Sequence, residues 1–218
     1  YPLFSGKNSF LFESVKGTEK IARYSFIGFD PYIALRAKDR NIEIDIDGNK
    51  SLSSQKPLVK LSEILSGYKQ QHQPLLPLFQ GGAAGLLSYD FVHYLERLPR
   101  TTRDDLRIPD AHFFIVDRLI SFDHKHKKAW AIVCPGLRNA TADPSSHYDE
   151  AEHLLNDMCR RIASSGNGIY GADKVHDKIE VKYEMKKEDY MHMVKRAKEY
   201  IAAGDIFQAN LSQRVSAH

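Results

Sequence analysis

The residues best suited to chemistry lie near the C-terminal end, in the stretch "GDIFQANLSQR" (204–214). Polar side chains alternate there with apolar ones, at Gln208, Asn210, Ser212 and Arg214. Such alternation is typical of a β-strand, which would place all four polar side chains on one face. That face either meets solvent or lines a polar pocket, in which the Arg214 guanidinium would suit a substrate carboxylate. The pattern alone leaves both possibilities open.

A second candidate is "FLFES" (10–14), where Glu13 and Ser14 directly follow a short apolar run. Small molecules often bind where strands end, although solvent begins there too. By pattern alone we expect a solvent-exposed strand end.

A third candidate is "DHKH" (123–126), which places His124 and His126 on one side of an extended segment beside Asp123. Two imidazoles and a carboxylate are able to hold a metal ion. The sequence supplies no distant further ligand, so a polar hairpin connection is the favoured interpretation, and we predict no metal ligand in this chain.

Composition excludes several classes of function. The net charge is only +3 and acidic residues are interspersed with basic ones, which argues against nucleic acid and membrane surfaces as partners. No apolar run is long enough to span a bilayer. The two cysteines, Cys134 and Cys159, lack metal-ligand spacing and are too few for a disulfide framework, so we expect a cytoplasmic protein. The chain starts at Tyr1 rather than Met, and both ends are expected to be truncated.

The first half of the chain is predicted to be rich in β-strands. Short aromatic and aliphatic runs occupy residues 9–14, 22–28 and 32–38, and 41–49 alternates isoleucines with acids before an Asp-Gly turn. A helix is predicted from Pro57, and a strand leading into a short helix over 81–99. The runs 111–123 and 127–133 predict a hairpin.

The pattern then becomes helical. Helices are predicted over 144–162 and 187–203, the second ending at Gly204, with a linker between them over 164–178. Mixed elements without strict alternation predict an α+β fold. We expect an N-terminal domain over 1–170, followed by a linker and the opening segment of a second domain over 171–218.

Five motifs together resemble component I of anthranilate synthase and aminodeoxychorismate synthase, in order and spacing. They are "FLFES", "ARYSFIGFDP", "GGAAGLLSYD", "IPDAHFFIVDRLISFDH" and "AGDIFQANLSQR". The resemblance runs from about residue 9 to residue 214. It implies an α+β architecture of two packed β-sheets with outer helices, truncated within the chorismate-binding domain.

The resemblance also implies an activity. These enzymes bind chorismate and Mg²⁺ and replace a chorismate hydroxyl by ammonia, which a glutamine amidotransferase subunit delivers. One branch releases anthranilate for tryptophan, whereas the other forms 4-amino-4-deoxychorismate for folate. The Asn210 in "Q-x-N-L" favours the second branch, that of aminodeoxychorismate synthase. The Mg²⁺ ligands are expected beyond His218, so the chain alone is expected to be inactive.

The resemblance implies a role for Gln208, because related enzymes that add water carry a lysine at this position as general base. Water needs its proton removed as it attacks, whereas neutral ammonia already carries a reactive lone pair. A glutamine orients reactants without acting as a base. Gln208 is therefore the predicted catalytic residue, and an isochorismate synthase is the disfavoured alternative.

Glu13 and Ser14 match the end of the motif that forms a tryptophan pocket in the anthranilate synthases. The resemblance makes them candidate allosteric tryptophan ligands. It also leaves open a different class of function, a non-catalytic module that binds an amino acid and docks the amidotransferase.

Overall fold

The fold was established from a computed structural model. It describes residues 8–14, 22–68, 72–134, 144–164 and 180–217. The chain divides into two compact units, Tyr1–Asn167 and Gly168–His218, called unit 1 and unit 2 below and described separately. The predicted domain boundary near residue 170 and most of the predicted linker lie outside the described residues.

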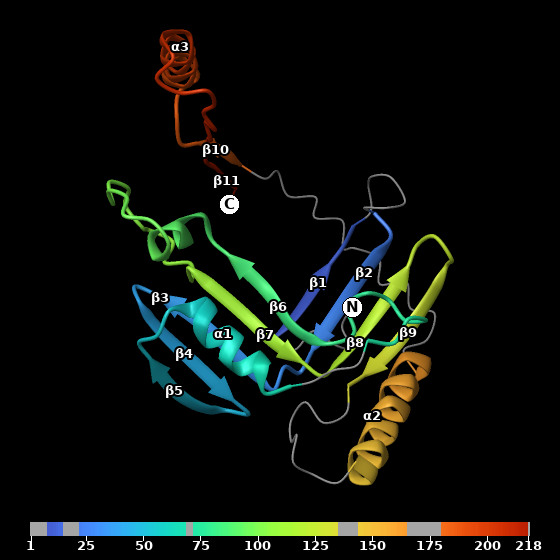
Figure 1. The fold of residues 1–218 in the computed structure, drawn as a ribbon. Coiled ribbons are helices and arrows are strands. Elements are labelled where there is room, and N and C mark those ends of the chain that lie inside the picture. The colour runs from blue at the N-terminus through green and yellow to red at the C-terminus, as the bar shows by residue number, and fades with distance from the viewer. Residues whose placement is uncertain (1–7, 15–21, 69–71, 135–143, 165–179, 218) are drawn as a thin grey trace. The chain divides into compact units, whose positions relative to one another are not determined.

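Two antiparallel sheets form unit 1 (Figure 1). The four-stranded sheet contains, in spatial order, β1 (Ser9–Phe12), β2 (Tyr24–Phe29), β8 (Arg118–Asp123) and β9 (Lys128–Val133). The five-stranded sheet contains β5 (Asn49–Ser53), β4 (Asn41–Ile46), β3 (Ile33–Lys38), β7 (Ala111–Val116) and β6 (Gly82–Leu87). The helices of this unit are α1 (Pro57–Ser66), the 3-10 helix η2 (Tyr89–Tyr94) and α2 (Pro144–Ser164). The predicted α+β architecture of sheets and outer helices is confirmed.

The β4–β5 hairpin follows the predicted alternation. Ile42 and Ile44 are buried, and Asp47 and Gly48 both adopt positive φ, 48° and 89°. Two positive φ values give the turn a twist that matches the flanking strands, which explains the Asp-Gly pair. Helix α1 lies across this sheet and inserts Leu61 into the core (Figure 1).

The small residues of β6 allow it to approach β7 closely. A Cβ atom at Gly85 would overlap the carbonyl oxygen of His112 and the backbone of Phe113. The "GGAAG" stretch is therefore a strand built for close backbone contact rather than a loop that binds phosphate.

Residues 111–123 were predicted as one strand, but they form two strands, β7 and β8. The break lies at the buried Asp117, so that β7 joins the five-stranded sheet and β8 joins the four-stranded one. The partner strands explain the break, because β6 pairs as far as Val116 and β2 pairs only from Leu119 onwards. The hairpin predicted through "HKH" is confirmed for β8 and β9.

Helix α2 packs against the four-stranded sheet, where Met158 is buried with Ile27, Phe29 and Ile120. Its predicted range is confirmed. None of the helices among the described residues has both the length and the apolar character needed to cross a membrane.

Unit 2 holds a short ribbon and one long helix. Strands β10 (Val181–Tyr183) and β11 (Val215–Ala217) pair antiparallel, and α3 (Lys187–Ala203) lies between them in the chain. Gly204 ends α3 in the left-handed conformation with φ 84°, as predicted. The predicted strand over 205–214 was wrong. Among the described residues of unit 2, β10 is only three residues long and pairs with β11 alone. Residues 205–214 therefore have no neighbouring strand with which to pair.

Candidate functional site

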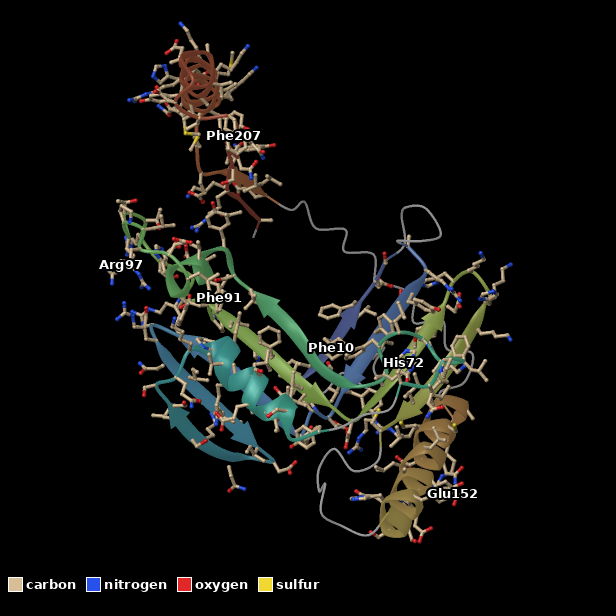
Figure 2. All side chains as sticks on the ribbon, in the orientation of Figure 1. Phe10, His72, Phe91, Arg97, Glu152 and Phe207 are labelled. Atoms are coloured by element: carbon tan, nitrogen blue, oxygen red, sulfur yellow. The ribbon has the colours of Figure 1, made fainter. Side chains whose placement is uncertain are left out.

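Strand β1 positions the candidate tryptophan ligands Glu13 and Ser14. The strand lies at the edge of its sheet, with Phe10 directly opposite Gly28 of β2. The Phe10 ring covers Gly28 so closely that a Cβ there would overlap it, and the ring centroids of Phe10 and Phe12 lie 4.9 Å apart (Figure 2). An aromatic ring over a cross-strand glycine fixes the register of an edge strand. Glu13 is exposed and Ser14 is half-buried.

The candidate catalytic segment lies in unit 2, directly after Gly204. The side-chain amide of Gln208 donates from Nε2 to Oδ1 of Asn210 over 3.3 Å. The two amides therefore lie on one side of the segment, as alternation predicts, although the backbone is not a strand. Both side chains are exposed, and Phe207 projects from the same segment with 93% of its surface exposed (Figure 2).

Arg214 immediately precedes β11 and is exposed. Its carbonyl oxygen accepts a hydrogen bond from the backbone N–H of Glu184 over 3.1 Å. The pKa of Glu184 lies below its usual value, mainly because Lys182 and Ser216 donate to the carboxylate, with a smaller contribution from the Arg214 charge. Glu13 and Ser14 belong to unit 1 and Gln208 and Arg214 to unit 2, so each pair is a candidate site of its own.

The "DHKH" cluster is a hairpin anchor. The Asp123 side chain is almost fully buried, and its Oδ2 accepts two hydrogen bonds from the Arg23 guanidinium, at 3.0 and 2.7 Å. Its Oδ1 accepts the backbone N–H groups of Lys125 and His126, and His126 Nδ1 lies 2.9 Å from Oδ2. The hydrogen bonds from Arg23, followed by those from His126 and by the Arg23 charge, hold the pKa of Asp123 well below its usual range. The favoured interpretation as a polar hairpin connection agrees with these contacts.

A second polar cluster, which the sequence patterns did not indicate, ties the segment between η2 and β7 to the five-stranded sheet. Tyr94 donates from its hydroxyl to Asp110 over 3.1 Å, and the same hydroxyl accepts the backbone N–H of Arg40. Lys38 donates to Asp104 and Asp110. Burial, followed by the contact with Asp110, raises the pKa of Tyr94, whereas the hydrogen bond to Asp104 raises that of Lys38. These partners are far apart in the sequence, so no local pattern reveals the cluster.

Comparison with known proteins places both units in one family. Residues 7–218 match the family model described as chorismate binding enzyme. The chain is 32% identical to anthranilate synthase component 1 of Acetivibrio thermocellus, over 94% of this chain and 42% of that protein. It is 30% identical to aminodeoxychorismate synthase component 1 of Bacillus subtilis, over 97% of this chain and 43% of that protein.

A solved structure agrees with these sequence relatives. The crystal structure of anthranilate synthase component I from Streptococcus pneumoniae matches with a TM-score of 0.68 and 27% identity, over 93% of this chain and 45% of that one. The chain therefore spans less than half the length of the relatives that it matches. The resemblance inferred from the five motifs is confirmed, and the chain belongs to the chorismate-binding enzyme family.

Proposed function

We propose that this chain is the N-terminal part of a component I that replaces a chorismate hydroxyl by an amino group, using ammonia from a glutamine amidotransferase. The observation that carries the proposal is the extent of the similarity, which includes the segment with Gln208. Relatives of both aminating kinds match 94–97% of the chain. Asn210 favours 4-amino-4-deoxychorismate as the product over anthranilate.

The chemistry of Gln208 supports amination over hydration. A side-chain amide offers two N–H donors and a carbonyl acceptor, and it has no basic nitrogen. Asn210 takes one of the N–H donors. The second N–H and the carbonyl oxygen are then able to orient ammonia and chorismate. Orientation is sufficient because neutral ammonia needs no proton removed in the attacking step. In this proposal Arg214 binds a substrate carboxylate.

The Mg²⁺ that the resemblance implies does not fit the residues that the structure describes. Among the described residues no three His, Cys, Asp or Glu side chains are grouped closely enough to hold an ion. We place its ligands after His218, and no role of the described residues depends on it.

A lysine substitution in the full-length protein tests the role of Gln208. We expect Gln208→Lys to lower the ammonium-dependent consumption of chorismate by roughly tenfold or more, because the geometry that orients the amine is lost. Gln213→Lys is the matched control, since it places the same new charge on the same exposed segment. An unchanged rate for Gln208→Lys would contradict the role proposed for Gln208, whereas consumption of chorismate by the wild type without ammonium would favour an isochorismate synthase.

A second candidate function, an amino-acid-binding and docking module, rests on the strand end at Glu13. The exposed carboxylate and the half-buried Ser14 hydroxyl suit the ammonium and backbone groups of tryptophan. Calorimetric titration of the full-length protein with L-tryptophan tests it, with Glu13→Gln expected to weaken binding and Asp45→Asn to leave it unchanged. Tryptophan binding without any turnover of chorismate would favour this candidate over the enzyme.

A further inference from the structure

The backbone over residues 204–214 is held at both ends by contacts within unit 2. Gly204 and Asp205 both donate their N–H groups to carbonyl oxygens in the last turn of α3. At the other end, the carbonyl oxygen of Arg214 accepts the N–H of Glu184, next to the paired strands β10 and β11. The course of the chain between these two anchors is therefore set inside one unit.

Between the anchors, the side-chain amides of Gln208 and Asn210 contact each other. Nε2 of Gln208 donates to Oδ1 of Asn210 over 3.3 Å. The terminal torsion of a glutamine side chain is broad and roughly two-fold, so an amide without a partner presents either its oxygen or its N–H₂ group to a given neighbour. The Asn210 oxygen accepts a hydrogen bond from the N–H₂ group alone. It therefore selects one of the two orientations and turns Oε1 of Gln208 away from Asn210.

The orientation of the Gln208 amide matters because ammonia is both a donor and an acceptor. Ammonia attacks carbon through its one lone pair, which must stay free for the new C–N bond. A neighbouring N–H group would donate to that lone pair and occupy it. A carbonyl oxygen instead accepts an N–H of ammonia and leaves the lone pair free to face chorismate. Oε1 is therefore the atom of Gln208 that holds ammonia productively.

We propose that Asn210 is a positioning residue, which holds the Gln208 amide with Oε1 towards the attacking ammonia. This inference rests on the proposed function, in which ammonia is the nucleophile. One N–H of Gln208 stays on Asn210, and the second is available to chorismate. Asn210 itself touches neither reactant and acts through Gln208.

Two substitutions of Asn210 in the full-length protein test this role. Asn210→Leu has a similar shape but no acceptor, so we expect kcat/KM for ammonium, measured at saturating chorismate, to fall about tenfold. The KM for chorismate and the thermal unfolding midpoint stay at their wild-type values. Asn210→Asp accepts a hydrogen bond but cannot donate one, so kcat/KM for ammonium stays within about threefold of the wild type. Gln213→Leu is the matched control, because it removes an amide from the same segment.

A double variant separates positioning from a structural role. Gln208→Met lacks the amide through which Asn210 acts. Adding Asn210→Leu to this variant should change kcat/KM for ammonium by less than about twofold, because the interaction is already lost. A further fall of about tenfold would show that Asn210 contacts a reactant or supports the fold, and would overturn the proposal.

Two other results would also overturn it. The first is wild-type kcat/KM for ammonium in Asn210→Leu. The second is an equal loss of activity in Asn210→Asp and Asn210→Leu, which would show that Asn210 donates to Gln208 instead of accepting from it. In both cases the wild type still aminates chorismate, so the proposed function stands. If the wild type consumes no chorismate in the presence of ammonium, the proposed function itself fails, and this inference fails with it.

Discussion

Replacing Asp123 by asparagine is expected to destabilise unit 1 in a pH-dependent way. The Asp123 carboxylate is 1% exposed. It accepts hydrogen bonds from two guanidinium nitrogens of Arg23 and from two backbone N–H groups of the β8–β9 turn, and it contacts the ring of His126. An asparagine retains only one acceptor oxygen. Either the turn N–H groups or the Arg23 guanidinium must then face an amide N–H₂ group.

The magnitude follows from the burial of the pair. Removing one partner of a buried ion pair costs about 3–5 kcal/mol. Arg23 is 35% exposed and regains some water, so we expect a loss of about 2–3 kcal/mol in the free energy of unfolding at pH 7. The folded-state pKa of Asp123 lies below its unfolded value of about 3.9. Its stabilising contribution is therefore complete above roughly pH 5 and is lost as the pH falls, by about 1 kcal/mol between pH 5 and pH 3.

The assay is urea unfolding followed by fluorescence. Trp130 is the only tryptophan of the chain and lies opposite Ser121 in the β8–β9 hairpin, so its emission reports on this sheet. The stability difference between the wild type and Asp123→Asn is expected to shrink between pH 5 and pH 3. Asp157→Asn, which removes one partner of an exposed pair on α2, is the control and should have little effect. A constant difference over this pH range, or a variant as stable as the wild type, would refute this explanation of the anchor.

Three further changes test the local structure. Lys186→Ser supplies the side-chain cap that α3 lacks and should raise the stability of unit 2 by about 1 kcal/mol; an unchanged thermal unfolding curve by circular dichroism would contradict this. Gly85→Val should cost more than about 2 kcal/mol, because its side chain collides with β7, whereas Gly67→Ala has room and should be neutral. Gly28→Val should displace the Phe10 ring and lower the affinity for tryptophan measured by calorimetry. An unaltered affinity would show that the end of β1 does not bind tryptophan.

The elements that sequence patterns predict well are those whose signals are local. The β4–β5 hairpin carries its own alternation and an Asp-Gly turn, and α3 carries an apolar stripe and a terminal glycine. Each of these signals acts over a few residues, so one segment is enough to specify the element.

The errors arose where a distant partner decides the structure. The run 111–123 has no turn signal at Asp117, yet the chain changes sheets there because its neighbouring strands do. Residues 205–214 alternate like a strand, but a strand also needs a neighbour to pair with. The polar cluster around Lys38 joins residues about 70 positions apart, which no local pattern encodes.

The candidate site was predictable only through resemblance. Spacing alone favoured a solvent-exposed strand end for Glu13 and gave no decision for Gln208, and both side chains are exposed in the structure. The roles proposed for Glu13 and Gln208 are predictions from the resemblance to the family.

The most direct test of the central claim is to incubate the full-length protein with chorismate, Mg²⁺ and ¹⁵N-labelled ammonium salt and to identify the product by mass. The proposed function predicts that chorismate is consumed only when ammonium is present and that the product carries the labelled nitrogen, as 4-amino-4-deoxychorismate or as anthranilate. An unlabelled isochorismate product, or chorismate left intact, would contradict the claim that this protein aminates chorismate.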